Sequence, residues 1–238
     1  MTVGSDRIPA NRPPTLRTRA QVLLERGRTD GWRDTSEQLG RRLWQEVYTE
    51  ELLFVLRKDL SSIVTPARHG LVQLRDLTPG DLPTLHQLNH RRGDVQADAR
   101  FEADLLTGYR AFVGLVDDQP IGHYWWTDDS TIPHYDVAHY GLQITLRDGD
   151  TYGSNLYVDP ENRRGGVATD FLYQIESALH DRGYTHIWGY VAAENQPARW
   201  LYAARGYEPR WKVTRRRVLR RWHSRVSQLD ADGDGHPS

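Results

Sequence analysis

The sequence of 238 residues contains no cysteine. This absence excludes disulfide bonds, thiolate zinc sites and a cysteine nucleophile. Long apolar runs are missing as well, because none approaches the roughly 20 residues that a bilayer-spanning helix needs. Residues 1–9 lack the apolar segment of a secretory signal peptide. We therefore expect a cytoplasmic protein without a membrane span.

An excess of one charge sign is also missing, since the formal net charge is -1 at pH 7. Nucleic-acid-binding domains usually carry a large positive excess, so we expect no nucleic-acid partner. Basic residues nevertheless gather between Arg210 and Arg225, where no acidic residue occurs. This basic stretch is either a solvated edge strand and tail, or it attracts cofactor phosphates, an acidic carrier protein or an anionic acceptor.

The domain organisation follows from shifts in composition along the chain. Residues 1–70 form an N-terminal extension, with a proline-containing flexible lead, short amphipathic helices at 16–26 and 36–47, and a strand at Glu51–Lys58. Residues 71–219 form the main domain. Residues 220–238 are expected to be a disordered tail, in which Asp230, Asp232 and Asp234 match only half of a calcium loop.

The main domain is predicted to begin with a strand near Leu71 and a helix near Leu82–Asn89. Two hairpins should follow, and then alternating helices and strands. The expected elements are strands 110–116 and 121–127, strands 140–147 and 152–158, a helix at about 166–182, a strand at 186–192, a helix at 197–204 and a strand pair within 208–219.

The stretch from Leu156 to Thr169, LYVDPENRRGGVAT, indicates a strand that leads through a glycine-arginine loop into a helix. Backbone N–H groups at a helix N-terminus have no intrahelical partner and lie at the positive end of the helix dipole. They can bind a phosphate without a base or a metal, and glycines let the chain approach it closely. The stretch therefore predicts an anion site, the alternative being an ordinary polar loop that caps a helix.

Two motifs carry a family resemblance. Arg163 to Ala168 fits R-x-x-G-x-G/A, and Asn195 to Tyr207 is similar to N-x-x-A-x-x-x-Y-x-x-x-G-F. In this order, separated by a predicted helix and strand, they resemble the GNAT superfamily of acyl-CoA-dependent N-acyltransferases. The family usually has Arg-Gly at the start of the loop, whereas Arg164 here precedes Gly165. The resemblance covers Leu71 to about Leu219, and nothing before Glu51 matches the common core.

The resemblance implies an α/β fold with a mixed, mostly antiparallel central sheet flanked by helices, here with an N-terminal helical extension. It also implies acetyl-CoA or another acyl-CoA as co-substrate, with no metal. The amides of residues 164–169 would hold the pyrophosphate, and the exposed strand edge at residues 156–158 would pair with the pantetheine arm. The cofactor-binding candidates are Leu156, Tyr157, Val158, Arg163, Arg164, Gly165, Gly166, Val167, Ala168, Thr169 and Asn195.

The resemblance places Tyr202 near the thioester sulfur, as the catalytic donor to the departing thiolate, and the alternative role is a core aromatic. Full proton transfer from a phenol to a thiolate is uphill by roughly 2 kcal/mol in water, which favours hydrogen-bond donation. Asn195 would contact the cofactor or the strand backbone, and it can equally cap the following helix.

An amine acceptor is mostly protonated at pH 7, so a proton acceptor is expected. The sequence does not identify it. Glu102, Asp104, His123, Asp150, Glu194 and a chain of water molecules are all candidates. The aromatic residues from Tyr124 to Trp126, with Trp188, Tyr190, Trp200 and Trp211, either pack in the core or form a wall for an acceptor or for an acyl chain longer than acetyl.

We therefore expect an N-acyltransferase that moves an acyl group, acetyl by default, from acyl-CoA to a small-molecule or peptide amine by direct transfer in a ternary complex. One alternative is transfer from an acyl-carrier protein to an amino acid, an amino sugar or a natural-product amine. Another is a non-catalytic acyl-CoA-binding regulatory module. The acceptor, the acyl chain length and the oligomeric state stay open.

Overall fold

A computed structural model describes residues 48–92, 96–129, 140–142, 144–218 and 221–229. The predicted flexible lead, the helices at 16–26 and 36–47 and the three aspartates after residue 229 lie outside these ranges. The chain divides into two compact units, of which the larger comprises Glu50–Arg216 together with the residues from His223 on. The described helices lie in this larger unit.

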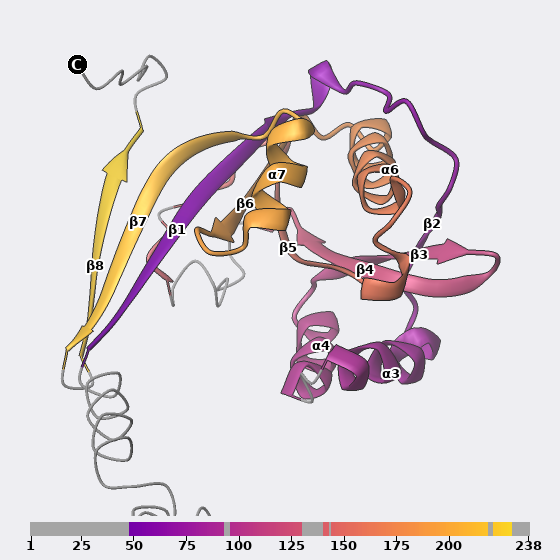
Figure 1. Cartoon of the computed structure of the whole chain (residues 1–238), viewed down its shortest axis with the longest axis horizontal. Coiled ribbons are helices and arrows are strands. Elements are labelled where there is room, and N and C mark those ends of the chain that lie inside the picture. The colour runs from indigo at the N-terminus through magenta and orange to yellow at the C-terminus, as the bar shows by residue number, and fades with distance from the viewer. Residues whose placement is uncertain (1–47, 93–95, 130–139, 143, 219–220, 230–238) are drawn as a thin grey trace, which may run out of the picture. The chain divides into compact units, whose positions relative to one another are not determined.

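Strands and helices alternate along the described residues, and Figure 1 shows their arrangement. The strands are β1 (Tyr48–Asp59), β2 (Gln73–Asp76), β3 (Arg110–Val116), β4 (Gln119–Thr127), β5 (Asp150–Val158), β6 (His186–Ala192), β7 (Glu208–Val218) and β8 (Arg221–Gln228). The helices are α3 (Leu82–Arg92), α4 (Gln96–Leu106), α6 (Val167–Asp181) and α7 (Gln196–Ala204), and short 3-10 turns occupy Leu60–Ser62, Pro79–Asp81 and Pro160–Asn162.

The strands form one sheet in the order β2-β3-β4-β5-β6-β1-β7-β8. Antiparallel pairing joins β2 to β3, β3 to β4, β4 to β5 and β1 to β6, whereas β5 and β6 are parallel. This arrangement confirms the expected α/β fold with a mixed, mostly antiparallel sheet flanked by helices.

Strand β1, which the sequence assigns to the N-terminal extension, is an interior strand of this sheet. It lies between β6 and β7 and pairs with β6 from Leu53 opposite Ala192 to Asp59 opposite His186. Its side chains are apolar on both faces: Val55 packs in one buried cluster and Leu56 in another. An interior strand that is covered on both sides requires this pattern.

The two faces of the sheet are covered by different helices, as the alternation of side chains along β4 shows. Trp126 packs with Phe171 and Ile175 of α6 on one face. Trp125 packs with Leu85 of α3 and Phe101 of α4 on the other face. Both tryptophans are fully buried, so they are core residues rather than a wall of a binding site.

Three parts of the sequence prediction differ from the structure. Residues 144–147 are not a strand, helix α4 was not predicted, and the second strand expected within 208–219 begins only at Arg221. Leu142, Ile144 and Leu146 are buried while Thr145 and Arg147 are exposed, so this segment has the burial pattern of a strand although no described strand pairs with it.

The expected disordered tail differs as well, because residues 221–228 form β8. The amide of Leu229 donates to the carbonyl of Arg210 at 3.0 Å, and Val226 packs against the cluster that contains Val213. Among the described residues, no helix is long and apolar enough to cross a bilayer.

Candidate acyl-donor site

The central feature of the candidate site is the divergence of two parallel strands. Asp150 pairs with His186, Thr151 with Ile187 and Tyr152 with Trp188, and the described pairing of β5 with β6 ends there. A Cβ on Gly189 would lie 3.1 Å from the carbonyl oxygen of Gly153, so a glycine at this position allows the backbones to approach closely at the apex. Beyond it, no described strand lies beside this edge of β5.

A β-bulge in β5 accounts for the divergence. His123 of β4 pairs with Tyr157 and Trp125 with Ser154, so one extra residue of β5 is inserted opposite Tyr124. Asn155 within this bulge has a φ of 49°, a left-handed conformation that asparagine tolerates better than most residues. Its side-chain oxygen accepts a hydrogen bond of 3.2 Å from Arg100 Nη2 of α4. Bulges bend the strand that carries them, which turns β5 away from β6.

The loop between β5 and α6 has the geometry of an anion site. Gly165 and Gly166 have φ values of 71° and 96°, and Gly166 is the N-cap of α6. Within the described part of the chain, the amides of Gly165, Gly166, Ala168 and Thr169 donate to no backbone carbonyl. Such amides at a helix N-terminus favour a bound phosphate. The loop therefore fits the pyrophosphate predicted for residues 164–169.

Arginine side chains surround this loop. The Nε of Arg163 donates to the carbonyl of Val158 at 2.8 Å, which fixes the end of β5, and Arg164 is exposed. Nη1 of Arg68 donates to the carbonyl of Gly165 at 3.3 Å, so a third cation lies beside the loop. The sequence did not identify Arg68, because 97 residues separate it from Gly165 and only the tertiary fold brings them together.

A cleft of about 300 Å³ opens where β5 and β6 diverge. Leu156, Asn195 and Tyr202 lie in its wall, as do two carboxylates, Glu51 and Glu194. The complete lining is Glu51, Leu53, Tyr140, Gly153, Ser154, Asn155, Leu156, Tyr190, Val191, Ala192, Glu194, Asn195, Ala198 and Tyr202. The structure thus brings the strand edge and the second sequence motif to one cavity. Tyr157 and Val158 are buried beside it.

Tyr202 lies on α7 with its ring 4.8 Å from that of Tyr207. Burial raises the pKa of Tyr202 above its usual value, so the hydroxyl remains protonated at neutral pH. Among the described residues this hydroxyl has no hydrogen-bond partner, which leaves its proton available to a ligand in the cleft. Asn195 caps α7, and its side-chain oxygen accepts a hydrogen bond of 3.3 Å from the amide of Ala198.

The five proton-acceptor candidates are placed apart by the structure. Only Glu194 lines the cleft. Asp150 bonds His186 at 3.1 Å at the far end of the strands, and His123 is buried beside Phe101. Glu102 and Asp104 both lie on α4, where Glu102 is 4.0 Å from His86 of α3. Glu51, which the sequence analysis did not consider, enters the cleft because β1 is an interior strand.

Part of the basic stretch forms ion pairs, whereas Arg221 and Arg225 on β8 are exposed. Arg215 is 1% exposed and pairs with Glu51 at 2.9 Å, and Arg216 pairs with Glu50 at 3.3 Å. The acidic partners of Arg215 and Arg216 come from β1. Arg215 is therefore not a surface residue that could attract a charged partner.

A sequence model described as the acetyltransferase (GNAT) family matches residues 73–207. A search of curated proteins finds no match. The fold is similar to that of a functionally unknown conserved protein from Staphylococcus epidermidis, at 12% identity and a TM-score of 0.53, covering 89% of this chain and 70% of that chain. It is also similar to a GCN5-related glucosamine N-acetyltransferase region of a fungal multi-domain β-N-acetylglucosaminidase, at 16% identity and a TM-score of 0.53, covering 76% of this chain and 22% of that one.

Proposed function

Because the chain belongs to the GNAT acetyltransferase family, we propose that it transfers an acyl group, acetyl by default, from acyl-CoA to an amine acceptor. The observation that carries this proposal is that Tyr202, with its protonated hydroxyl, and the edge of β5 beyond its described pairing with β6 meet at one cleft. The loop before α6, in which Gly165 and Gly166 have positive φ values, continues from the end of β5.

Acyl-CoA fits the residues around the cleft. The amides of the loop, with Arg68 and Arg164 beside it, would hold the negatively charged pyrophosphate. The edge of β5 would pair with the amides of the pantetheine arm, which leads the thioester toward Tyr202. This pairing uses only the backbone, so the side chains of Tyr157 and Val158 can remain in the core.

The transfer is direct in this proposal, because the sequence contains no cysteine that could hold the acyl group as a thioester. The amine nitrogen attacks the thioester carbonyl, the carbon–sulfur bond breaks, and the departing thiolate accepts a hydrogen bond from Tyr202. Since burial raises the pKa of Tyr202, proton transfer to the sulfur is even less favourable than in water. Tyr202 therefore stabilises the developing charge mainly as a hydrogen-bond donor.

The attacking amine must lose a proton, because only about 1 molecule in 2,500 of an amine with a pKa near 10.4 is neutral at pH 7. Glu51 and Glu194 are the carboxylates in the lining of the cleft. Arg215 already neutralises Glu51, whereas Glu194 is exposed and forms no ion pair with another described residue. Glu194 is therefore the better placed of the two to receive the proton, directly or through water.

Two measurements on the purified full chain test this function. Calorimetry with CoA and acetyl-CoA should show binding, and release of free thiol from acetyl-CoA should accelerate with a member of a panel of primary amines. Binding without thiol release for any amine would favour the non-catalytic acyl-CoA-binding module. Absence of binding to either nucleotide would contradict the acyl-CoA proposal as a whole.

A further inference from the structure

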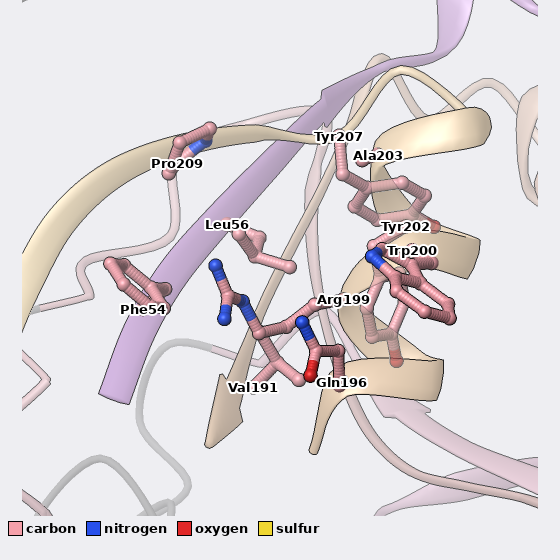
Figure 2. A pocket seen from close by; sticks show the side chains of 10 residues that line it. All are labelled: Phe54, Leu56, Val191, Gln196, Arg199, Trp200, Tyr202, Ala203, Tyr207 and Pro209. Atoms are coloured by element: carbon pink, nitrogen blue, oxygen red, sulfur yellow. The ribbon is translucent and has the colours of Figure 1, made fainter. Parts of the chain in front are cut away.

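A second cavity lies beside the cleft, against α7. It has a volume of about 210 Å³ and is lined by Phe54, Leu56, Val191, Gln196, Arg199, Trp200, Tyr202, Ala203, Tyr207 and Pro209. Figure 2 shows these side chains, with Phe54 and Leu56 of β1 on one side and Trp200, Tyr202 and Ala203 of α7 on the other. We refer to it as the α7 pocket.

The α7 pocket is apolar inside and open at its rim. Leu56, Val191 and Tyr207 at its base are buried. Trp200 at the rim is 68% exposed, which is unusual for so large an apolar side chain. An apolar cavity with an aromatic side chain at its rim has the character of a ligand-binding pocket.

The α7 pocket and the cleft share part of their walls, because Val191 and Tyr202 line both. A group attached to a thioester beside Tyr202 therefore has an apolar cavity immediately next to it. The alkyl end of an acyl group whose thioester lies in the cleft can therefore extend past Tyr202 into the α7 pocket.

The charges around the two cavities indicate where the amine and the alkyl chain lie. An amine acceptor is a cation at neutral pH and is suited to reach the thioester through the cleft, where Glu194 is exposed. Of the described residues that line the α7 pocket, Arg199 alone is charged, and its guanidinium lies 5.0 Å from the ring of Phe54. This lining repels an ammonium group and suits an uncharged alkyl chain.

We propose that the α7 pocket binds the alkyl chain of an acyl-CoA donor longer than acetyl. The cavity of about 210 Å³ leaves room for more than a two-carbon acyl group, so a longer alkyl chain can enter it. This inference rests on the proposed acyl-CoA function and specifies its donor.

The test is calorimetry of the full chain with CoA and with acetyl-, butanoyl-, hexanoyl-, octanoyl- and dodecanoyl-CoA. Burial of a methylene group contributes about 0.8 kcal/mol, so the affinity should rise by up to about fourfold for each methylene and level off once the pocket is filled. Ala203→Phe should fill the pocket and abolish this gain, while CoA itself binds as tightly as to the wild type.

The matched control is Ala204→Phe. Ala204 is exposed on the same helix and does not line the α7 pocket, so this variant should retain the dependence on chain length. If CoA binds but acetyl- and octanoyl-CoA bind equally well, the α7 pocket does not take the acyl chain, although the proposed function survives. If the affinity of Ala203→Phe still increases with the length of the acyl chain, the inference is overturned as well. Failure of CoA itself to bind would instead contradict the proposed function.

Discussion

Tyr202 is the residue on which the chemistry depends most. Replacing it with phenylalanine removes a hydroxyl but keeps the ring that packs against Tyr207. We expect Tyr202→Phe to lower turnover by about 10- to 1,000-fold, the range for losing one positioned donor, with nearly unchanged CoA affinity. Steady-state kinetics and calorimetry check this expectation. Unaffected turnover would assign Tyr202 to packing alone.

The pH dependence should also reflect the environment of Tyr202. Burial raises its pKa, so the hydroxyl keeps its proton well above pH 10 and cannot cause a loss of turnover between pH 7 and 10. Any rise in turnover over that range should come from deprotonation of the amine. The wild type and Tyr202→Phe should therefore show profiles of the same shape. A fall near pH 10 that only the wild type shows would contradict a raised pKa.

Gly153 shows how a single residue fixes the apex of the cleft. A Cβ at this position would overlap the hydroxyl and ring of Tyr124, which is fully buried on β4. Gly153→Ala should lower the free energy of unfolding by about 1–3 kcal/mol or more through overpacking. In a Tyr124→Ala background the same change should cost much less. Chemical denaturation of the wild type, the two single variants and the double variant measures the interaction energy between the two positions. If the two losses of stability are additive, the residues do not compete for space.

At the scale of elements, we expect the two ends of α6 to differ in their importance for CoA binding. Gly166→Glu places a negative group where phosphate is expected and should abolish measurable CoA binding. Gly183→Glu is the matched control, because Gly183 also has a positive φ, of 89°, and follows the other end of α6. Both variants carry the same added charge and comparable backbone strain. Equal loss of CoA affinity in the two variants would remove the loop from the proposed site.

The contact between α6 and the turn after α7 is a buried ion pair. Glu176 of α6 bonds both Nε and Nη2 of Arg205, and Arg205 Nη1 also donates to the carbonyl of Val64 at 2.6 Å. Burial raises the pKa of Glu176 in spite of its cationic partner. Removing one member of such a pair leaves an uncompensated buried charge, which costs about 3–5 kcal/mol.

Arg205→Met should therefore destabilise the protein strongly at pH 7.5 and less at pH 5. Without Arg205, the pKa of Glu176 rises further, and the folded protein takes up a proton as the pH falls. A raised folded-state pKa gives stability that is present at low pH and is lost as the pH rises through that pKa. Chemical denaturation at both pH values measures the difference in the free energy of unfolding.

The control is Arg182→Met, which breaks the surface pair with Asp76 and should lower the free energy of unfolding by about 1 kcal/mol or less at either pH. A cost for Arg205→Met that is equal at both pH values would show that Glu176 stays ionised.

The elements also show what the sequence could predict. Strand β6 and helices α6 and α7 were located closely, because local signals such as Gly166 and Asn195 mark their ends. The alternation of apolar and polar residues from Leu142 to Leu146 predicts a strand, and this prediction is wrong. An extended segment that packs against a sheet also buries every second residue, even where it forms no hydrogen bonds to a described strand. Neither Arg68 beside the loop nor Glu51 in the cleft has a local signal, because their positions depend on contacts across the fold.

At the scale of the whole molecule, the position of β1 affects both the central sheet and the two cavities. The family match begins at residue 73, yet β1 at residues 48–59 lies between β6 and β7 in the sheet. The sequence of β1 predicts a strand, but it does not predict where this strand lies in the sheet. The residues of β1 and β6 that pair with each other are more than 120 positions apart in the chain. β1 also provides Glu51 to the cleft and Phe54 to the α7 pocket.

The region that matches the family should therefore not fold without β1. In a fragment of residues 73–238, β6 and β7 would each lose a neighbouring strand, and their backbone groups and the apolar residues that pack against Val55 and Leu56 would face water. We expect this fragment to be insoluble or to lack cooperative unfolding, whereas the full chain unfolds cooperatively. Circular dichroism and size-exclusion chromatography compare the two. A soluble, cooperatively folded fragment would show that β7 can pair with β6 directly and that β1 is an addition to the sheet rather than part of its core.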